Sequence, residues 1–517
     1  MLNRKKIILF ILFLTVALGI APVFADTKVT ILHTNDTHAH LIPFDDPDHG
    51  TNCGGIVRRA GLIELIKKEG NNPLLLDAGD IFQGTTFFTL FKGEACYRAA
   101  KAIGLDATTM GNHELDLGIE HLLEMLDKTQ LKLLACNVAW PDGKKLVFQP
   151  YSVFVRNGIK IGVIGRVGHD NWGDCNIKVT NKMKLLDDTE TIRETAKRIR
   201  PYVDLLVVIS HSEVENDRKL AASVAELDIV IGGHTHSKIM RPELIKHNKT
   251  AGNYDNGLGG TLFTEAYEWG HYLGRVDFIF DDNKKIKSWD GGLIEVRPDH
   301  EKFAPHLIKH LVKYYDYRRL KAINTVIAHS EKGLPYEKSM RSKKMCPAGI
   351  FTCESLKYVA KADIGMVNAK GVRCGIAPGD IKVGDIHTML PFDNNIIVFT
   401  LKGDQLPGLF DHAAKIWEKQ SSTVFSGVTG ELYVDENKAK NIRVNGQPID
   451  PNKEYKIAVT SFIADGNDGG DVFFAKPISI KDTGIIMRDA VIEYMEYLKE
   501  IPEIDYEPLK IIRTKSK

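Results

Sequence analysis

The sequence has no excess of charge of either sign. Among its 517 residues, 68 lysines and arginines nearly balance 67 aspartates and glutamates. A chain without a strong net charge has no long-range attraction to nucleic acid or to an anionic membrane. We therefore expect no nucleic acid polymer as a partner, and any anion that the protein recognises must be bound locally.

The sequence also lacks C-x-x-C spacing, which argues against a zinc site built from thiolates. In an oxidising compartment some of the seven cysteines would pair, and their odd number would leave at least one free. The sequence does not define the pairing. The seven are Cys53, Cys96, Cys136, Cys175, Cys346, Cys353 and Cys374.

Beyond its N-terminus the chain has no apolar run long enough to cross a bilayer. Residues 1–25 combine a basic start, an apolar run and the small-residue exit Val23-Phe24-Ala25, a pattern typical of a secretory signal peptide. An uncleaved anchor is the alternative, which the short apolar run disfavours. We expect cleavage, no stable membrane span afterwards, and a periplasmic or extracellular protein.

Strand-like runs alternate with helical patterns in the first part of the chain, which predicts an α/β (α+β) fold. Residues 57–68 and 119–127 have apolar side chains at helical spacing. Further strand-like segments at 151–155, 160–167 and 274–280 predict a mixed sheet rather than a purely parallel one.

A chain of 517 residues is too long for a single core, so two folded domains are expected. Phe303, Leu307, Leu311 and Tyr315 recur at four-residue steps, which predicts an amphipathic helix bridging the domains. The predicted divisions are a signal peptide at 1–25, a larger first domain at 26–298, a bridging helix at 299–322 and a smaller α/β domain at 323–517.

Polar side chains directly follow five strand-like apolar runs. Acidic residues behind a buried strand are costly unless they are paired or bind a metal, and strand ends are where open α/β folds bind ligands. In chain order these side chains are Asp36 and His38, then Asp80, then Asn112, His113 and Asp116, then His211, and finally His234 and His236.

Seven of these side chains, all except His113 and Asp116, offer a ligand set of oxygen and nitrogen without sulfur. Such a set suits zinc, manganese, iron, cobalt or nickel, of which we favour zinc, manganese or cobalt. Seven ligands are too many for one catalytic ion, whereas two ions about 3.5–4 Å apart would use them all, hold a phosphate ester and activate a water. Any single cluster could equally be ordinary core or surface, but their shared position at strand ends favours one site.

The order D-x-H, G-D, G-N-H-E, H and G-G-H-T-H resembles that of the calcineurin-like metallophosphatases, and within them the secreted bacterial 5′-nucleotidase and UDP-sugar hydrolase family. The resemblance covers nearly the whole expected mature chain. It implies two divalent ions, one bound by Asp36, His38 and His236, the other by Asn112, His211 and His234, with Asp80 as the bridge.

The resemblance also implies that His113 does not bind metal but pairs with Asp116, three residues on. This spacing places both side chains on one face of a helical turn. A carboxylate that keeps an imidazole protonated provides a proton donor for the phosphate or its leaving group. The alternative for Asp116 is the N-cap of a helix over residues 117–126.

In the second domain, the segment from Asn368 to Arg373 resembles the family's Asn-Gly-Gly-Gly-Ile-Arg segment, although two glycines are replaced. The resemblance implies that Asn368, Arg373, Phe392, Phe462 and Asp468 bind substrate, with the two phenylalanines stacking on the base.

One position departs from the family pattern. The family usually has an arginine where this chain carries Lys344, five residues before Gly349. The lysine ammonium is a point charge, whereas the planar guanidinium of arginine can bind a phosphate through two N–H groups. The exchange is therefore expected to shift the preference among phosphates.

The sequence therefore predicts a secreted dinuclear-metal phosphoesterase that hydrolyses nucleotides, with 5′-nucleoside monophosphates as the first substrates to test. A UDP-sugar or 2′,3′-cyclic-nucleotide hydrolase with the same metals is the alternative. Phe392 and Phe462 argue against the related hydrolase of thiosulfate oxidation, and the complete ligand set argues against a catalytically inactive nucleotide-binding surface protein. The oligomeric state stays open.

Overall fold

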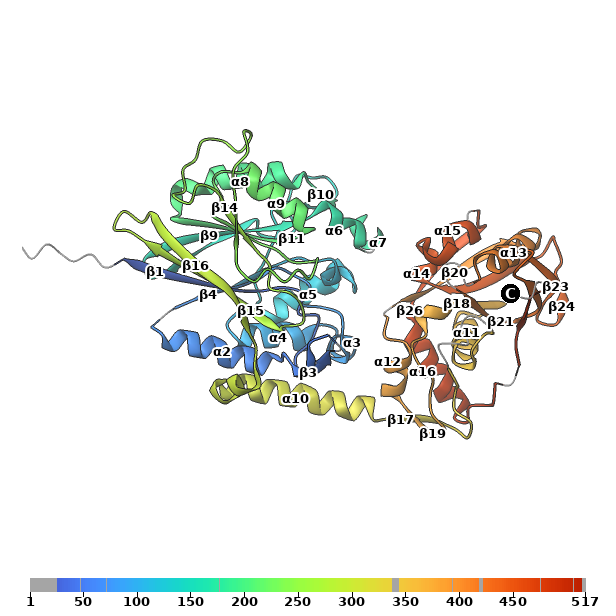
Figure 1. The fold of residues 1–517 in the computed structure, drawn as a ribbon. Coiled ribbons are helices and arrows are strands. Elements are labelled where there is room, and N and C mark those ends of the chain that lie inside the picture. The colour runs from blue at the N-terminus through green and yellow to red at the C-terminus, as the bar shows by residue number, and fades with distance from the viewer. Residues whose placement is uncertain are drawn as a thin grey trace, which may run out of the picture. The chain divides into compact units, whose positions relative to one another are not determined.

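The computed structural model describes residues 26–46, 48–70, 72–175, 177–336, 344–392, 394–417, 422–474, 476–504 and 506–513. The expected signal peptide at residues 1–25 lies outside this part of the chain. Two compact units divide the chain, Met1–Tyr317 and Arg318–Lys517 (Figure 1).

The first unit contains a six-stranded sheet in the order β16-β15-β1-β4-β5-β6. Strands β1, β4, β5 and β6 run parallel, whereas β15 and β16 are antiparallel to their neighbours. The strands are β1 (Thr27–Thr34), β4 (Leu74–Asp77), β5 (Ala107–Thr109), β6 (Leu133–Leu134), β15 (Tyr272–Phe280) and β16 (Ile286–Glu295).

A second six-stranded sheet in the same unit has the order β13-β14-β12-β11-β9-β8. The inner strands β9, β11, β12 and β14 are parallel, and both edge strands are antiparallel. The strands are β8 (Tyr151–Arg156), β9 (Ile159–Val167), β11 (Leu205–His211), β12 (Ile229–Ile231), β13 (Glu243–Ile245) and β14 (Thr261–Thr264).

The two sheets share one apolar core. Alternate side chains of a strand point to opposite faces, so Leu205 and Val207 of β11 join Ile31 of β1 between the sheets. Leu206 and Val208 point the other way, into the layer that packs against helices. The sequence predicted mixed sheet topology correctly, but the strands form two packed sheets rather than one.

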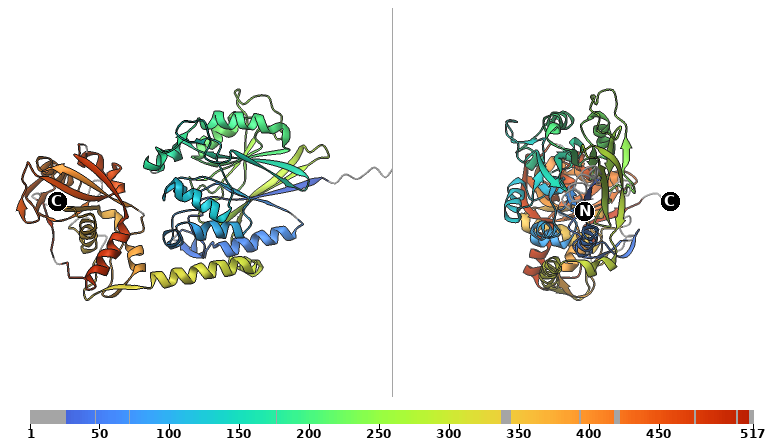
Figure 2. Two further views of the ribbon diagram at one scale, coloured as in Figure 1. Left: turned by 180° about the vertical axis from the view of Figure 1, so that it is seen from behind. Right: turned by 90° about the vertical axis from the view of Figure 1, so that its left-hand side faces the viewer.

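Helices cover the outer face of each sheet, as Figures 1 and 2 show. Apolar side chains of α2 (Ile56–Lys68), α4 (Glu94–Ala102) and α5 (Ile119–Thr129) pack in the core on the side of β1, whereas α8 (Asp188–Ile199) and α9 (Val214–Ser223) pack on the side of β11. The shorter elements of the unit are β2 (Phe44–Asp46), β3 (Gly50–Cys53), α3 (Thr86–Phe91), η1 (His113–Leu115), β7 (Val138–Ala139), α6 (His169–Asp174), α7 (Ile177–Thr180), β10 (Lys184–Leu185), η2 (Arg200–Tyr202) and η3 (Pro298–Phe303).

The second unit is a smaller α/β body around its own core. A five-stranded sheet in the order β21-β18-β25-β20-β26 lies beside sheets of four strands, β24-β23-β22-β27, and two strands, β17-β19. The strands are β17 (Val326–Ser330), β18 (Ile364–Asn368), β19 (Gly379–Lys382), β20 (Asn395–Lys402), β21 (Thr423–Ser426), β22 (Val428–Tyr433), β23 (Lys438–Val444), β24 (Gln447–Pro448), β25 (Glu454–Thr460), β26 (Ser479–Ile486) and β27 (Leu509–Ile512).

The helices of this unit are α11 (Pro347–Ala360), α12 (Val383–Met389), α13 (Leu406–Ile416), α14 (Ser461–Ala464), α15 (Gly470–Phe473) and α16 (Met487–Leu498), with short turns η5 (Ala369–Gly371), η6 (Gly403–Gln405) and η7 (Asn467–Gly469). Together the units confirm the predicted α/β (α+β) fold class. The predicted domain limits stay predictions.

The helix between the units differs from its prediction. Helix α10 runs from His306 to Ile323, after the separate turn η3, and it buries Ile308, Val312 and Tyr315. Leu307, which was expected on the buried face, is 68% exposed. The predicted face was right at Tyr315, which is buried, and at Leu311, which packs against the core, but it was wrong at Leu307, and Phe303 belongs to the preceding turn.

Contrary to the expectation of disulfides, five cysteines of the described chain are free thiols, namely Cys53, Cys96, Cys136, Cys353 and Cys374. Five of the seven cysteines are buried, namely Cys96, Cys136, Cys175, Cys346 and Cys353. Burial raises the pKa of Cys96 well above its usual range and that of Cys136 to about 12, so these thiols are protonated and behave as small apolar side chains. Within the described residues, no helix has the length and apolar character needed to cross a membrane.

Candidate active site

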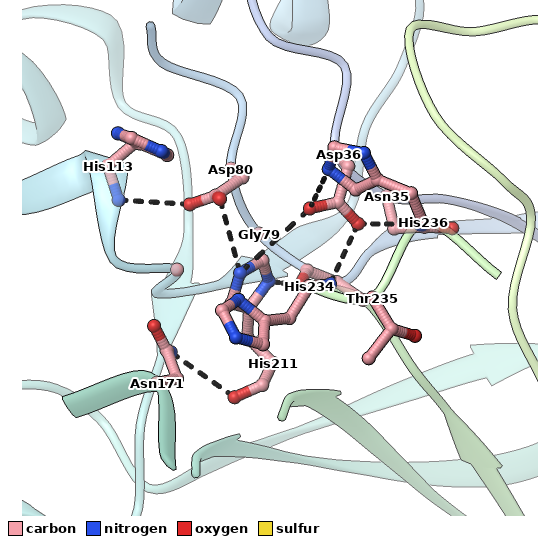
Figure 3. Close-up of polar contacts among 12 residues, drawn as sticks. Asn35, Asp36, Gly79, Asp80, His113, Asn171, His211, His234, Thr235 and His236 are labelled. Carbon is pink, nitrogen blue, oxygen red and sulfur yellow. Dashed lines mark hydrogen bonds and ion pairs between the residues drawn. The ribbon is translucent and has the colours of Figure 1, made fainter. Parts of the chain in front are cut away.

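The carboxyl ends of parallel strands from both sheets meet at one place in the first unit. Asp36 and His38 follow β1, Asp80 follows β4, and His211 is the last residue of β11. His236 lies in the loop after β12. Figure 3 shows Asp36, Asp80, His211 and His236 pointing toward one another.

The distances define a compact cluster. His211 Nε2 lies 3.2 Å from Asp80 Oδ2 and 3.9 Å from Asp36 Oδ1. His38 Nε2 lies 3.8 Å from each of these two carboxylates and 3.2 Å from His236 Nε2, which is itself 3.4 Å from Asp36 Oδ1. The two carboxylates therefore stand between imidazoles contributed by both sheets.

The other two predicted ligands lie beside this cluster. His234 packs its ring against His211, with 5.1 Å between the ring centroids, and its backbone N–H donates to Asp36 Oδ2 at 2.9 Å. Asn112 follows β5 and is 8% exposed, next to Gly111. The fold thus gathers all seven predicted ligands in one region, while their division between two ions stays a prediction.

Several of these residues hold a left-handed backbone conformation. The φ angles are 46° at Asp36, 42° at His38, 54° at Asp80, 90° at His234 and 54° at His236. Such angles cost non-glycine residues of order 1 kcal/mol or more each and persist only where the surroundings enforce them. Here Asp36 N donates to Gly79 O at 2.9 Å and His38 N to Asp80 O at 3.0 Å, which locks the two loops together.

Two glycines allow the loops to approach this closely. A Cβ atom on Gly111 would lie 2.0 Å from Asp80 Oδ1, and one on Gly79 would lie 2.9 Å from His211 Nδ1. Any side chain at Gly111 would therefore displace the carboxylate of Asp80.

Glu114 holds the same loops from behind. Its buried carboxylate accepts backbone N–H donors from Asp80 at 2.9 Å, Ile81 at 2.9 Å, Phe82 at 3.2 Å and Gly111 at 2.8 Å. Burial, and then the charge of Asp80, raises the pKa of Glu114 to about 7, which the backbone donors partly offset. Glu114 thereby fixes the loop of Asp80 against the loop of Asn112.

The cluster has the polar atoms that a divalent cation needs. Asp36 Oδ1, Asn112 Oδ1 and His211 Nε2 are buried without a hydrogen-bond partner among the described residues. Buried polar atoms are normally satisfied, and an orphaned set converging from three loops fits an ion. The residues therefore fit the metal that the motifs imply, with oxygen and nitrogen ligands only.

The pKa values of two histidines also indicate that the carboxylates of the cluster need positive charge beside them. Burial would lower the pKa of His211, but the charges of Asp80 and Asp36 raise it to about 10. Burial likewise opposes protonation of His236, and the neighbouring carboxylates of Asp36 and Glu268 raise its pKa to about 10. When these imidazoles are protonated, they supply the positive charge that the two carboxylates require. An imidazole that binds a metal ion must be neutral, so a bound cation would replace these protons.

His113 and Asp116 form the predicted pair. His113 Nδ1 lies 2.9 Å from Asp116 Oδ2, and the backbone N–H of His113 donates to Asp80 Oδ1 at 3.0 Å. Burial opposes protonation of His113, but Asp80 and Asp116 raise its pKa to about 9. The alternative role of Asp116 as an N-cap is wrong, because α5 begins at Ile119 with Gly118 as its cap.

Sequence reasoning missed three supporting side chains, Asn35, Glu114 and Glu268. Asn35 donates to Asp36 Oδ2 at 2.7 Å, and Glu268 forms an ion pair with His236 Nδ1. The signal for Glu114 was present, since it is the last letter of the G-N-H-E motif. Glu268 has no local signal, because it lies in a segment between strands without a motif.

In the second unit, the predicted substrate residues form two local pairs. Asn368, the last residue of β18, donates from Nδ2 to Asp468 Oδ2 at 2.9 Å. The guanidinium carbon of Arg373 lies 5.8 Å from the centre of the Phe392 ring, within the range of a cation–π contact. Phe392 is 42% and Phe462 39% exposed.

Lys344 is exposed in the segment before α11. Burial raises the pKa of Glu507, and the charge of Lys344 opposes that shift. Its assignment to the substrate site stays a prediction.

Comparisons with known proteins agree with this picture. Residues 29–238 match the family model of the calcineurin-like phosphoesterases, and residues 326–475 match that of the 5′-nucleotidase C-terminal domain. A 5′-nucleotidase of Vibrio parahaemolyticus is 28% identical over 525 residues, covering 94% of this chain and 92% of the relative. An apyrase of Tabanus yao is 26% identical over 527 residues, covering 92% of each.

Among solved structures, a 5′-nucleotidase precursor from Thermus thermophilus has a TM-score of 0.61 and 26% identity, covering 94% of this chain and 99% of the other. Fold, site and first match define the class: a calcineurin-like phosphoesterase, a metal-dependent hydrolase of phosphoric esters. With the second match, the chain combines a calcineurin-like phosphoesterase domain with a 5′-nucleotidase C-terminal domain. The resemblance read from the motifs is confirmed.

The role of Glu114 leads to a prediction. In Glu114→Gln, the amide nitrogen cannot accept the backbone N–H groups, and each buried donor left unpaired costs about 1–3 kcal/mol. We expect a lower unfolding temperature and a loss of bound metal, measured by calorimetry and elemental analysis. Glu120→Gln, at an exposed surface pair with Lys182, is the matched control and should change neither. Full metal content in Glu114→Gln would contradict the role.

Proposed function

We propose that this protein is a secreted phosphoesterase that uses two divalent metal ions to hydrolyse nucleotides, releasing phosphate from 5′-nucleoside monophosphates. The observation that carries the proposal is the convergence of orphaned buried atoms from Asp36, Asn112 and His211 at the strand ends. The names of the relatives support nucleotides as the substrate class. Zinc, manganese and cobalt are the ions to test first.

Each part of the site has a proposed task. Bound ions would supply Lewis acidity toward the phosphate ester. Asp36, His38 and His236 would hold one ion, Asn112, His211 and His234 the other, and Asp80 would bridge. His113, kept protonated by Asp116, would donate a hydrogen bond or a proton to the phosphate oxygens or leaving group.

The second unit is proposed to select the substrate. Phe392 and Phe462 expose rings that a planar base can stack on without identifying it, which favours broad tolerance of bases. Arg373 and Lys344 supply positive charge, and Asn368 with Asp468 supplies a polar pair. Export to the periplasm or the outside is part of the proposal and is supported by the pattern of residues 1–25.

The direct test is phosphate release from a panel of AMP, ADP, ATP, UDP-glucose, cyclic nucleotides and bis-p-nitrophenyl phosphate. ADP and ATP belong in the panel because one relative is an apyrase. Chelation should abolish release and single added metals should restore it, with AMP preferred. A preference for UDP-glucose or a cyclic nucleotide would favour the alternative that the protein is a UDP-sugar or cyclic-nucleotide hydrolase. If the metal-loaded protein released phosphate from none of these compounds, the assignment as an enzyme would be wrong.

A second test separates metal binding from proton transfer. Asn112→Ala should lose both metal and activity, because it removes a proposed ligand. His113→Ala should keep its metal while kcat falls about 10²- to 10⁴-fold, the usual contribution of a general acid. Metal content by elemental analysis and kcat with AMP measure the two effects. Equal metal loss in both variants would refute the division of roles.

The stacking role can be tested with Phe392→Ala and Phe462→Ala. Loss of one stacking ring costs about 1–3 kcal/mol per base, so KM for AMP should rise roughly tenfold. Turnover of bis-p-nitrophenyl phosphate, which has no base, should not change. Tyr497→Ala, at a ring 65% exposed on α16, is the control for removal of a surface aromatic. An unchanged KM for AMP in both phenylalanine variants would rule out stacking.

A further inference from the structure

A second cluster of metal-ligating side chains lies in the first unit, apart from the seven predicted ligands. Asp46 ends strand β2, His49 follows in the turn to β3, and His271 directly precedes β15. One ligand atom from each lies within 4.8 Å of the other two. Asp46 and His271 are buried, whereas His49 is exposed, so the cluster is open to solvent on one side.

The distances suit a small ion. His271 Nε2 lies 2.9 Å from Asp46 Oδ2, and His49 Nδ1 lies 3.5 Å from Asp46 Oδ1. Around a tetrahedral ion with bonds of about 2.0–2.2 Å, neighbouring ligand atoms lie roughly 3.3–3.6 Å apart. Small rotations of these side chains would therefore form the coordination polyhedron.

The surroundings hold the three side chains in this arrangement. Asp46 Oδ1 accepts the backbone N–H groups of Asp48 at 2.8 Å and His49 at 3.2 Å, which folds the turn and returns His49 toward Asp46. The Tyr267 ring packs against both imidazoles, with centroids 5.0 Å from His49 and 5.4 Å from His271. The ligands are therefore preorganised by the hairpin and by an aromatic neighbour.

The local charge also favours a cation. The turn carries Asp45, Asp46 and Asp48, and within the described chain Asp46 forms ion pairs with the imidazoles of His49 and His271. Two imidazoles with one carboxylate are ligands that zinc and similar transition metals prefer over magnesium or calcium.

We propose that Asp46, His49 and His271 form an additional site for one divalent transition metal ion, such as zinc, with solvent completing its coordination. This site is separate from the proposed catalytic pair. The ion would join the β2–β3 hairpin to the segment before β15.

That segment also reaches the catalytic cluster. Trp269 N donates to Asp36 O at 2.8 Å, and Glu268 forms the ion pair with His236. An ion bound to His271 would therefore restrain the residues that position Asp36 and His236. Asp46, His49 and His271 would act on catalysis through position, without touching the substrate.

The experiment is a count of bound zinc per full-length chain after equilibration and removal of excess ion. Wild type should hold one equivalent more than His49→Ala, whose side chain lies in an exposed turn. His306→Ala, at an exposed histidine of α10, is the matched control and should keep the wild-type count. Equal counts in wild type and His49→Ala, or an equal loss in His306→Ala, would overturn the proposal.

Asp46→Asn provides a second variant that keeps the shape of the side chain and an acceptor oxygen. We expect at least a tenfold weaker affinity for the additional zinc, measured by competition with a chromogenic chelator, and unchanged affinity would overturn the site. The same counts in an Asn112→Ala background separate this site from the proposed function. There, adding the His49→Ala substitution should still remove one zinc, even though the catalytic ligand is already lost.

Discussion

The structure depends on the burial of two carboxylates, Asp36 and Asp80, at the meeting point of two sheets. Burial alone would disfavour their charge, yet His211 holds the pKa of both below the usual range. Such a concentration of negative charge is stable only beside positive charge. The surrounding imidazoles, the orphaned atoms and the close loops all follow from this requirement, which a divalent ion satisfies.

The apolar core between the sheets makes that arrangement rigid. Side chains such as Ile31 and Val207 interlock between β1 and β11, so the strand ends of one sheet keep a fixed position against those of the other. Close-packed interiors deform little. The strained backbone at Asp36 and His38 is maintained by this packing and by the hydrogen bonds to the loop of Asp80.

Hydrogen bonds link the loops around the site to the rest of the first unit. Glu114 ties the loops of β4 and β5 from one side, and the segment with Glu268 and Trp269 ties the loop of β1 from the other. The cluster at Asp46 and His271 lies on that second segment. The candidate metal ligands and the residues that support them are thus contributed by elements that are distant in sequence, and each loop is held by more than one neighbour.

The sequence by itself determined the local elements and the list of candidate ligands. Apolar runs at 29–32, 74–76 and 205–209 are strands in the structure, and residues 57–68 fall within α2, because periodic burial is written in local side-chain order. Local order misled at α10, where the helical phase depends on the residues it packs against, and in the expected disulfides.

Only the tertiary structure decided which faces meet. Packing decides that the strands form two sheets and that Glu114 accepts four N–H groups from earlier residues. Packing also brings Asp46 into contact with His271, which lies 225 residues later in the chain. Alternation reports that a face is buried but not what buries it. The motif letters therefore named the chemistry of this protein, whereas the supports of the site and the additional histidine cluster required the fold.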